Sequence, residues 1–143
     1  MDTARLEELR RALATDRTID IVTVGARTGQ PRTTEIWFTV VDEEIFICGT
    51  PAGDGSPGGR RKRDWVANLK AHPEFDFVLK ESVRETLRAR ATVITDADER
   101  TRVFSAPATG WYRDATGSLE DLVAGGPLVK VTFVGEAAPL NPS

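Results

Sequence analysis

Alternation of apolar and polar residues along the chain predicts a protein built mainly of short strands. Alternation over four to eight residues is typical of a strand with one buried face, and β-branched and aromatic residues favour that structure. Segments of this kind are separated here by Gly, Pro, Asn and Asp, which interrupt regular elements. We expect six strands, at residues 18–24, 32–41, 44–48, 74–80, 84–94 and 128–134.

A longer periodicity predicts the helices. Leu6, Leu9 and Leu13 recur at helical spacing and form an apolar stripe opposite a charged face. Further helices are expected at 64–71, 96–105 and 118–124, an irregular segment at 106–116, and a frayed tail at 136–143.

Six antiparallel strands with short peripheral helices indicate a small closed or split β-barrel, because closure removes exposed sheet edges. We expect one domain over residues 1–143. Its expected parts are an N-terminal helix at 1–15, a core at 18–95, C-terminal helices with the last strand at 96–135, and the tail.

Composition narrows the class of protein. The 143 residues carry a net charge of −3 and are 40% hydrophobic, which suffices for one core and argues against a dedicated nucleic-acid binder. A single cysteine excludes an internal disulfide and fits a reducing cytoplasm. No apolar run is long enough to span a bilayer. We therefore expect a soluble cytoplasmic protein with no integral membrane segment.

The turn between the first two expected strands carries the most distinctive chemistry. Gly25, Gly29 and Pro31 break regular structure, and Arg27 and Arg32 lie beside hydroxyl and amide side chains. Arginine forks match the oxygens of phosphates and carboxylates. The turn therefore suits an anionic ligand, with an ordinary solvated hairpin as the alternative.

A glycine-rich loop at 49–59 leads into four consecutive cations at 60–63 and then into an expected helix. Its glycines formally spell G-x-G-x-x-G, but Pro57 interrupts the motif and its last glycine opens no helix, so we reject a dinucleotide site. Cations ahead of a helix N-terminus can bind an anion, because both fields are positive. A solvated basic loop is the alternative.

Conventional catalytic groupings are poorly supported. His72 precedes a proline at a helix end, where helix capping is the better interpretation. Cys48 lies in an apolar strand and is expected to be a buried hydrophobe. No His, Cys or carboxylate cluster has metal-ligand spacing, so no metal site is expected. A cofactor enzyme fits better, because there the cofactor supplies the reactive atom.

Two sequence blocks resemble the deazaflavin-dependent nitroreductase family, whose members are flavin or deazaflavin oxidoreductases with the split β-barrel of pyridoxamine-phosphate oxidases. The first block, V-T-V-G-x-R-T-G-Q-P-R, spans 22–32, and the second, W-V-A-N-L-K-A-H-P, spans 65–73. His72 replaces the family's usual Asn. The resemblance extends over residues 18–95. It implies an FMN-binding type of split barrel and hydride transfer from reduced coenzyme F-420 to a quinone, enone or nitro-type acceptor.

The resemblance also implies which residues form the site. The turn would hold the phosphate and acidic tail of the cofactor through Arg27, Thr28, Gln30 and Arg32. The strand beside the deazaflavin ring would contribute Thr33, Thr34, Glu35 and Ile36, followed by Trp37, the candidate catalytic residue that faces the substrate. The next strand would contact the ring through Cys48, Gly49 and Thr50. The helix that closes the site would contribute Trp65 and Asn68.

The chain departs from the family pattern at three positions, one among these residues and two beside them. Ala26 stands where many members have a second basic residue, Glu35 where Pro is common, and Pro51 where Lys often helps to hold the tail. Two cations are therefore missing, and each charge-assisted contact contributes about 1.5–3 kcal/mol. Our hypothesis is that Arg61 and Arg63 replace them from the other side of the loop.

Two other functions stay open at this point. The protein could be an FMN-binding oxidoreductase, or a non-catalytic module that binds an anionic, cofactor-like ligand, since fold does not fix function. Trp111 and Tyr112 could line the acceptor pocket, although packing is the better interpretation because aromatic residues so often fill cores. The strand edges could support a homodimer, as in many split barrels.

Overall fold

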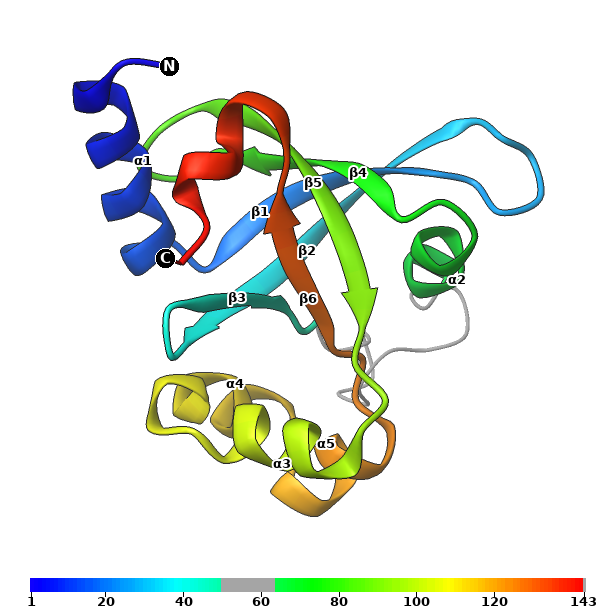
Figure 1. Ribbon diagram of the computed structural model, residues 1–143. Helices are drawn as coiled ribbons and strands as arrows, with labels where there is room; N and C mark the ends of the chain where they lie inside the picture. The colour runs from blue at the N-terminus through cyan, green and yellow to red at the C-terminus, as the bar shows by residue number, and fades with distance from the viewer. Residues whose placement is uncertain (50–63, 143) are drawn as a thin grey trace.

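The computed structural model describes residues 1–49 and 64–142, and six strands in these ranges close into an antiparallel barrel (Figure 1). The order around the barrel is β1-β2-β3-β6-β5-β4. The strands are β1 (Thr18–Val24), β2 (Pro31–Val41), β3 (Glu44–Ile47), β4 (Glu74–Leu79), β5 (Glu85–Val93) and β6 (Val129–Phe133). The predicted six-stranded antiparallel barrel is confirmed, and each strand end lies within one residue of its expected place.

Short helices surround the barrel. They are α1 (Thr3–Thr15), α2 (Asp64–Ala71), α3 (Ala97–Ser105), α4 (Gly110–Thr116) and α5 (Leu119–Gly125), with the 3-10 helices η1 (Pro107–Thr109) and η2 (Gly135–Leu140). Two predictions are wrong. The segment 106–116 is largely helical, and the expected frayed tail forms η2, whose Ala137 and Leu140 are buried.

Both helical segments are stabilised by tertiary contacts, which explains why the sequence patterns did not predict them. The Arg113 side chain donates to the carbonyls of Phe104 and Ala106 at 2.6 and 2.9 Å, which holds α4 against the end of α3. The Asn141 amide bonds both backbone groups of Phe133, at 2.8 and 2.9 Å, and so ties the chain end to β6. Helices this short depend on packing more than on their own propensity.

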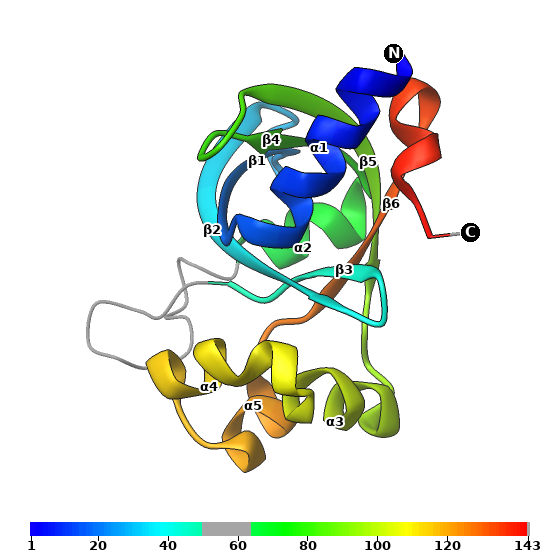
Figure 2. The ribbon, with the colours of Figure 1, turned by 90° about the vertical axis from the view of Figure 1, so that its left-hand side faces the viewer.

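The buried apolar residues form two separate clusters. The barrel core fills the interior and continues under α1, α2 and η2, with Phe38, Phe77 and Phe133 in edge-to-face contact near its centre. The second cluster, which we call the helical-layer core, lies between the barrel wall and α3, α4 and α5. Figure 2 shows these three helices gathered beside β3 at one end of the molecule.

Within the described ranges, every helix is too short or too polar to cross a membrane.

Candidate functional site

The turn between β1 and β2 is closed by its own backbone. The N–H of Gly25 donates to the Gln30 carbonyl at 2.8 Å, and the N–H of Gly29 donates to the Gly25 carbonyl at 2.9 Å. The Thr28 hydroxyl accepts from the Gln30 N–H at 3.2 Å. A Cβ on Gly25 would lie 2.5 Å from that hydroxyl oxygen, and Gly29 has a φ of +69°. Both glycines are therefore needed for this conformation.

The side chain of Asn68 links α2 to the turn and so joins the two family-like sequence blocks. Its Oδ1 accepts from the Ala26 N–H at 2.8 Å, and its Nδ2 donates to the Thr23 hydroxyl at 3.2 Å. Asn68 is only 7% exposed and Thr23 is fully buried. Because water has little access to these bonds, they fix the position of the turn.

The two arginines of this region stand free at the barrel end. Arg27 and Arg32 are exposed, and neither has an ion pair or side-chain hydrogen bond within residues 1–49 and 64–142. The β1–β2 register pairs Arg32 with Thr23, so Arg32 lies on the face that Asn68 contacts. Thr28 and Gln30 are also exposed in the same turn. The structure therefore brings together the residues predicted to hold an anion.

Strand alternation divides the predicted ring-contact residues between two faces of β2. The side chain of Ile36 is 1% exposed and belongs to the barrel core, and Thr34 faces the same interior opposite Ile21. Thr33, Glu35 and Trp37 form the opposite, outward row. Only the outward side chains can contact a ligand outside the barrel wall.

Glu35 lies in an ion cluster that crosses three strands. The Lys80 ammonium contacts Asp20 Oδ1 at 2.7 Å and also the Glu35 carboxylate. The hydrogen bonds that Lys80 donates, first to Asp20 and second to Glu35, raise the pKa of Lys80. Sequence reasoning missed Lys80, because only the strand register reveals that the three charges are neighbours.

Trp37 lies where the outer face of β2 meets the helical layer. Its ring centroid is 5.5 Å from that of Trp111 and 6.1 Å from that of Tyr112. The Arg17 guanidinium carbon lies 4.6 Å from the Trp111 ring centroid, in a cation–π contact. Tyr112 is 1% exposed and serves packing, whereas Trp111 is only partly buried. Trp37, Trp111 and Arg17 therefore form one continuous edge of the molecule.

The Cys48 side chain lies in the helical-layer core and is fully buried, as expected for a small hydrophobe. Burial raises the pKa of its thiol. The Tyr112 hydroxyl donates to the Cys48 carbonyl, and burial raises the pKa of this phenol as well. The thiol of Cys48 is buried and its carbonyl already accepts a hydrogen bond, so neither group is available to a ligand.

Gly49 follows with a φ of +78° in a tight contact. A Cβ at this position would lie 3.0 Å from Pro127 Cγ and 3.5 Å from Trp65 Cζ2. Trp65 itself is 4% exposed and packs in the barrel core. The predicted site residues Thr50, Arg61 and Arg63 lie outside the described residues.

Among the described side chains, no group of three or more His, Cys, Asp or Glu residues could hold a metal ion.

Solved structures place the fold in a known class. A conserved hypothetical protein from Mycobacterium tuberculosis aligns with a TM-score of 0.65 and 18% identity, over 94% of this chain and 82% of that chain. A pyridoxinephosphate oxidase family protein from Clostridium acetobutylicum gives 0.63 and 12%, over 95% and 87%. An FAD-binding protein from Mesorhizobium loti gives 0.55 and 14%, over 90% and 87%. The predicted split-barrel fold of the flavin-binding type is therefore confirmed.

The family follows from the sequence match. Residues 7–118 match the family described as F420H(2)-dependent quinone reductase, and this protein belongs to that family. The predicted relationship to deazaflavin-dependent reductases is thereby confirmed, and the protein is an oxidoreductase that acts on a small-molecule substrate. No curated protein sequence matches the chain significantly.

Proposed function

We propose that this protein transfers a hydride from reduced coenzyme F-420 to a small electron-poor acceptor, either a quinone, an enone or a nitro compound. The family assignment supports the oxidoreductase class and the cofactor. The structural observation that supports it most directly is the contact of Asn68 with Ala26 and Thr23. That contact holds in place the turn that carries Arg27 and adjoins Arg32, and exposed guanidinium groups suit an anionic cofactor.

The residues present fit the phosphate and acidic tail of a deazaflavin. Arg27 and Arg32 would hold the anionic groups, since neither guanidinium has a partner in the described ranges. When bound, the reduced deazaflavin supplies the hydride, which is chemistry that no side chain of the chain can supply.

Other residues shape the surroundings of that site. The Lys80 ammonium pairs with Glu35 as well as with Asp20, and so reduces the repulsion that the Glu35 carboxylate would exert on an anionic ligand. The outward edge formed by Trp37 and Trp111 offers two indole rings, inclined to each other by 59°, and a planar acceptor could stack on one of them. The Arg17 guanidinium, held over Trp111, would donate hydrogen bonds to an acceptor oxygen.

A fluorescence titration of the purified protein with coenzyme F-420, and in parallel with FMN, tests the proposal. We expect micromolar binding of F-420, followed by oxidation of the reduced coenzyme when menadione is added. Binding of FMN without a response to F-420 would favour the alternative of an FMN-dependent oxidoreductase. Binding of F-420 without turnover of any quinone, enone or nitro acceptor would favour a non-catalytic module.

Asn68→Ala tests the role of the turn, with Asn141→Ala as the matched control. Both variants remove an amide that makes two hydrogen bonds, but Asn141 bonds Phe133 in β6. Because the Asn68 bonds are buried, we expect F-420 affinity to fall about tenfold in Asn68→Ala, which corresponds to about 1.4 kcal/mol. Equal losses in both variants would reject a specific role for Asn68.

The hypothesis that Arg61 and Arg63 supply the two missing cations stays a prediction, because these residues lie outside the described ranges. Its test is the double variant Arg61→Ala/Arg63→Ala. Affinity for F-420 equal to that of the parent protein would reject it.

A further inference from the structure

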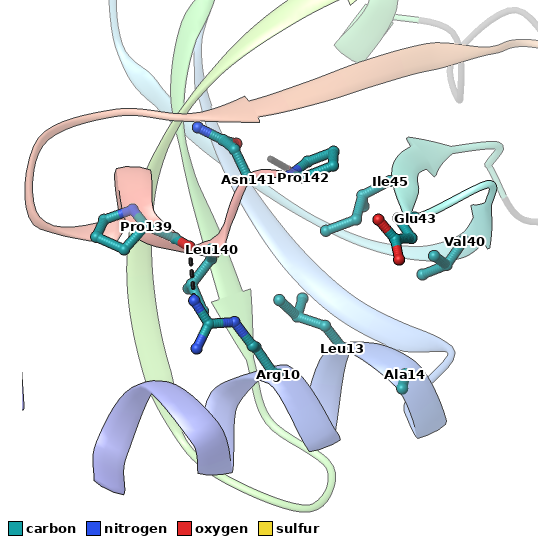
Figure 3. A pocket seen from close by; sticks show the side chains of 10 residues that line it. All are labelled: Arg10, Leu13, Ala14, Val40, Glu43, Ile45, Pro139, Leu140, Asn141 and Pro142. Atoms are coloured by element: carbon teal, nitrogen blue, oxygen red, sulfur yellow. Dashed lines mark hydrogen bonds between the residues drawn. The ribbon is translucent and has the colours of Figure 1, made fainter. Parts of the chain in front are cut away.

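A cavity of about 630 Å³ lies between α1, the β2–β3 hairpin and η2 (Figure 3). This volume is in the range of small-molecule sites. The cavity is lined by Arg10, Leu13, Ala14, Val40, Glu43, Ile45, Pro139, Leu140, Asn141 and Pro142.

This cavity is remote from the turn that carries the proposed cofactor site. The strand β2 runs from the turn, at Pro31, to the hairpin beside the cavity, at Val41. The lining residue Val40 is ten positions beyond Gln30, which amounts to about 30 Å along an extended strand. Figure 1 accordingly shows α1 and η2 at the end of the barrel away from the β1–β2 turn. A ligand here would not share the cofactor's position.

The floor of the cavity is apolar and belongs to the barrel core. Leu13, Ile45 and Leu140 are members of that core, and Val40 packs against it. Of the remaining six lining residues, Ala14 and two prolines are apolar, and the other three are polar or charged. A ligand with an apolar body would therefore cover core residues where the barrel end is open.

The charges of the neighbouring hairpin select the head group. Three acids follow one another at its tip, and two of them are paired: Asp42 contacts Arg102 at 2.8 Å, and Glu44 contacts both Arg102, at 3.2 Å, and Lys130. Glu43, between them, has no ion pair or side-chain hydrogen bond within the described ranges, and it lines the cavity.

The backbone at Glu43 is also unusual for this residue type. Asp42 and Glu43 have φ values of 52° and 68°, a left-handed pair that hairpin turns usually fill with Asn and Gly. A glutamate in this conformation is disfavoured, and such positions often coincide with functional sites. The hairpin therefore holds an unpaired carboxylate at the cavity under local strain.

Arg10 makes one side of the cavity positively charged, whereas Glu43 makes another side negatively charged. Its guanidinium donates to the Pro139 carbonyl at 2.8 Å and so joins α1 to η2. Figure 3 shows Arg10 and Glu43 at different sides of the cavity, with Leu13 between them. A cationic head would be repelled from the Arg10 side and attracted to the Glu43 side.

We propose that this cavity is a second ligand site, for a small amphipathic molecule whose apolar body covers Leu13, Ile45 and Leu140 and whose amine head pairs with Glu43. The site is independent of the reductase proposal, since it shares no residue with the turn or the aromatic edge. Charge complementarity at Glu43 distinguishes it from a general apolar surface.

Octylamine, octanol and octanoate, each titrated below its aggregation concentration into the ¹⁵N-labelled full chain, test this site. The three probes share one tail and differ only in the charge of the head. We expect shifts in α1, the β2–β3 hairpin and η2, with the amine binding most tightly and the carboxylate least. Because Glu43 is exposed, the amine should exceed the alcohol by roughly two- to fivefold.

Two pairs of variants locate the site. Glu43→Gln should bring the amine to the affinity of the alcohol, whereas Glu120→Gln, an exposed acid on α5, should not. Ala14→Phe should abolish binding of all three probes by filling the rim, whereas Ala4→Phe, exposed on the same helix but outside the lining, should leave binding unchanged. The proposal is overturned by an absence of binding, by shifts elsewhere, by equal or tighter binding of octanoate, or by full binding in Ala14→Phe.

Discussion

The strands β1 and β3 belong to the same barrel but differ in how they are buried. Along β1, buried residues such as Ile19 and Ile21 alternate with half-buried ones, because only one face of this strand packs into the barrel core. Along β3, Ile45, Phe46 and Ile47 are all buried. The inner residues of β3 face the barrel core, and Phe46 faces the helical-layer core.

This difference matches two patterns in the sequence. Alternation of apolar and polar residues indicates a strand with one buried face, and a continuous apolar run indicates a strand with two buried faces. The proposed acceptor edge lies at the boundary between these situations, since Trp37 on β2 touches Trp111 and Tyr112 of α4 at the rim of the helical layer. The two cores should therefore be separable by mutation.

The largest effect is expected in the barrel core. The ring of Phe77 contacts Phe38 at 5.5 Å and Phe133 at 5.4 Å between centroids, and it is fully buried. Phe77→Ala should lower the free energy of unfolding by about 4–5 kcal/mol, measured by urea denaturation. Val78→Ala, on the half-buried outer face of the same strand, is the control. An equal loss in the control would mean that the interior is not the main source of stability.

Phe46→Ala probes the other core and should be milder, at about 3 kcal/mol. Phe46 is fully buried but faces the helical layer, where Arg102 lies over its ring at 6.0 Å. Amide hydrogen exchange should show protection lost mainly in α3, α4 and α5, with β1 and β4 still protected. Uniform loss of protection over the barrel would contradict the division into two cores.

Arg100 stabilises the helical layer through polar contacts. Its guanidinium donates to the carbonyls of Ile94, Leu122, Val123 and Gly126, and its burial lowers its pKa. Arg100→Gln would leave several carbonyls without donors, so we expect a loss of about 2–3 kcal/mol in unfolding free energy.

Arg90→Gln, an exposed arginine on β5, is the matched control and should change the stability little. Near-parent stability of Arg100→Gln would indicate that water replaces the lost donors and that packing alone holds α5.

The contrast between the two cores also explains what the sequence could predict. The strand ends were predicted to within one residue. This was possible because the order of apolar and polar residues within a strand determines which of its faces is buried. The turn at 25–30 was recognisable because its glycines and arginines are contiguous. Asn68 could be placed at the site from its motif, whereas its hydrogen bonds to Thr23 and Ala26 could not.

Contacts between distant segments were beyond local patterns. The α4 segment has no apolar stripe of its own, and Arg113 holds it by bonds to α3 and the following residue. Lys80, Asp20 and Glu35 meet only after the register of three strands is known. Thr23, a threonine at an inward position of β1, is a local sign of a buried polar contact.

The cluster of Lys80, Asp20 and Glu35 should contribute little to stability, because its side chains are partly exposed. Its ion pairs are partly solvated, so Lys80→Met should change the unfolding free energy by less than about 1 kcal/mol. Its effect on F-420 affinity should be larger, because Glu35 would lose its counter-charge. Adding Glu35→Gln should restore that affinity, and failure to do so would place Glu35 outside the cofactor site.

The smallest expected effect is on the pH dependence of stability, and it involves Glu44 in β3, beside the helical layer. Hydrogen bonding to Lys130, with further help from Arg102, lowers the pKa of Glu44 in the folded state. A lowered pKa means that the unfolded chain binds the proton more readily, so this stabilisation is present above the unfolded value, about 4.3, and is lost as the pH falls through the folded value. In Glu44→Gln the acid limb of the stability curve should therefore be flatter, by less than about 1 kcal/mol between neutral pH and acid. Urea titrations of both proteins at a series of pH values measure this directly. Parallel curves would show that solvent screens the Glu44 pair fully, which would leave Phe46 with its apolar neighbours and the Asp42–Arg102 pair to hold the helical layer to the hairpin.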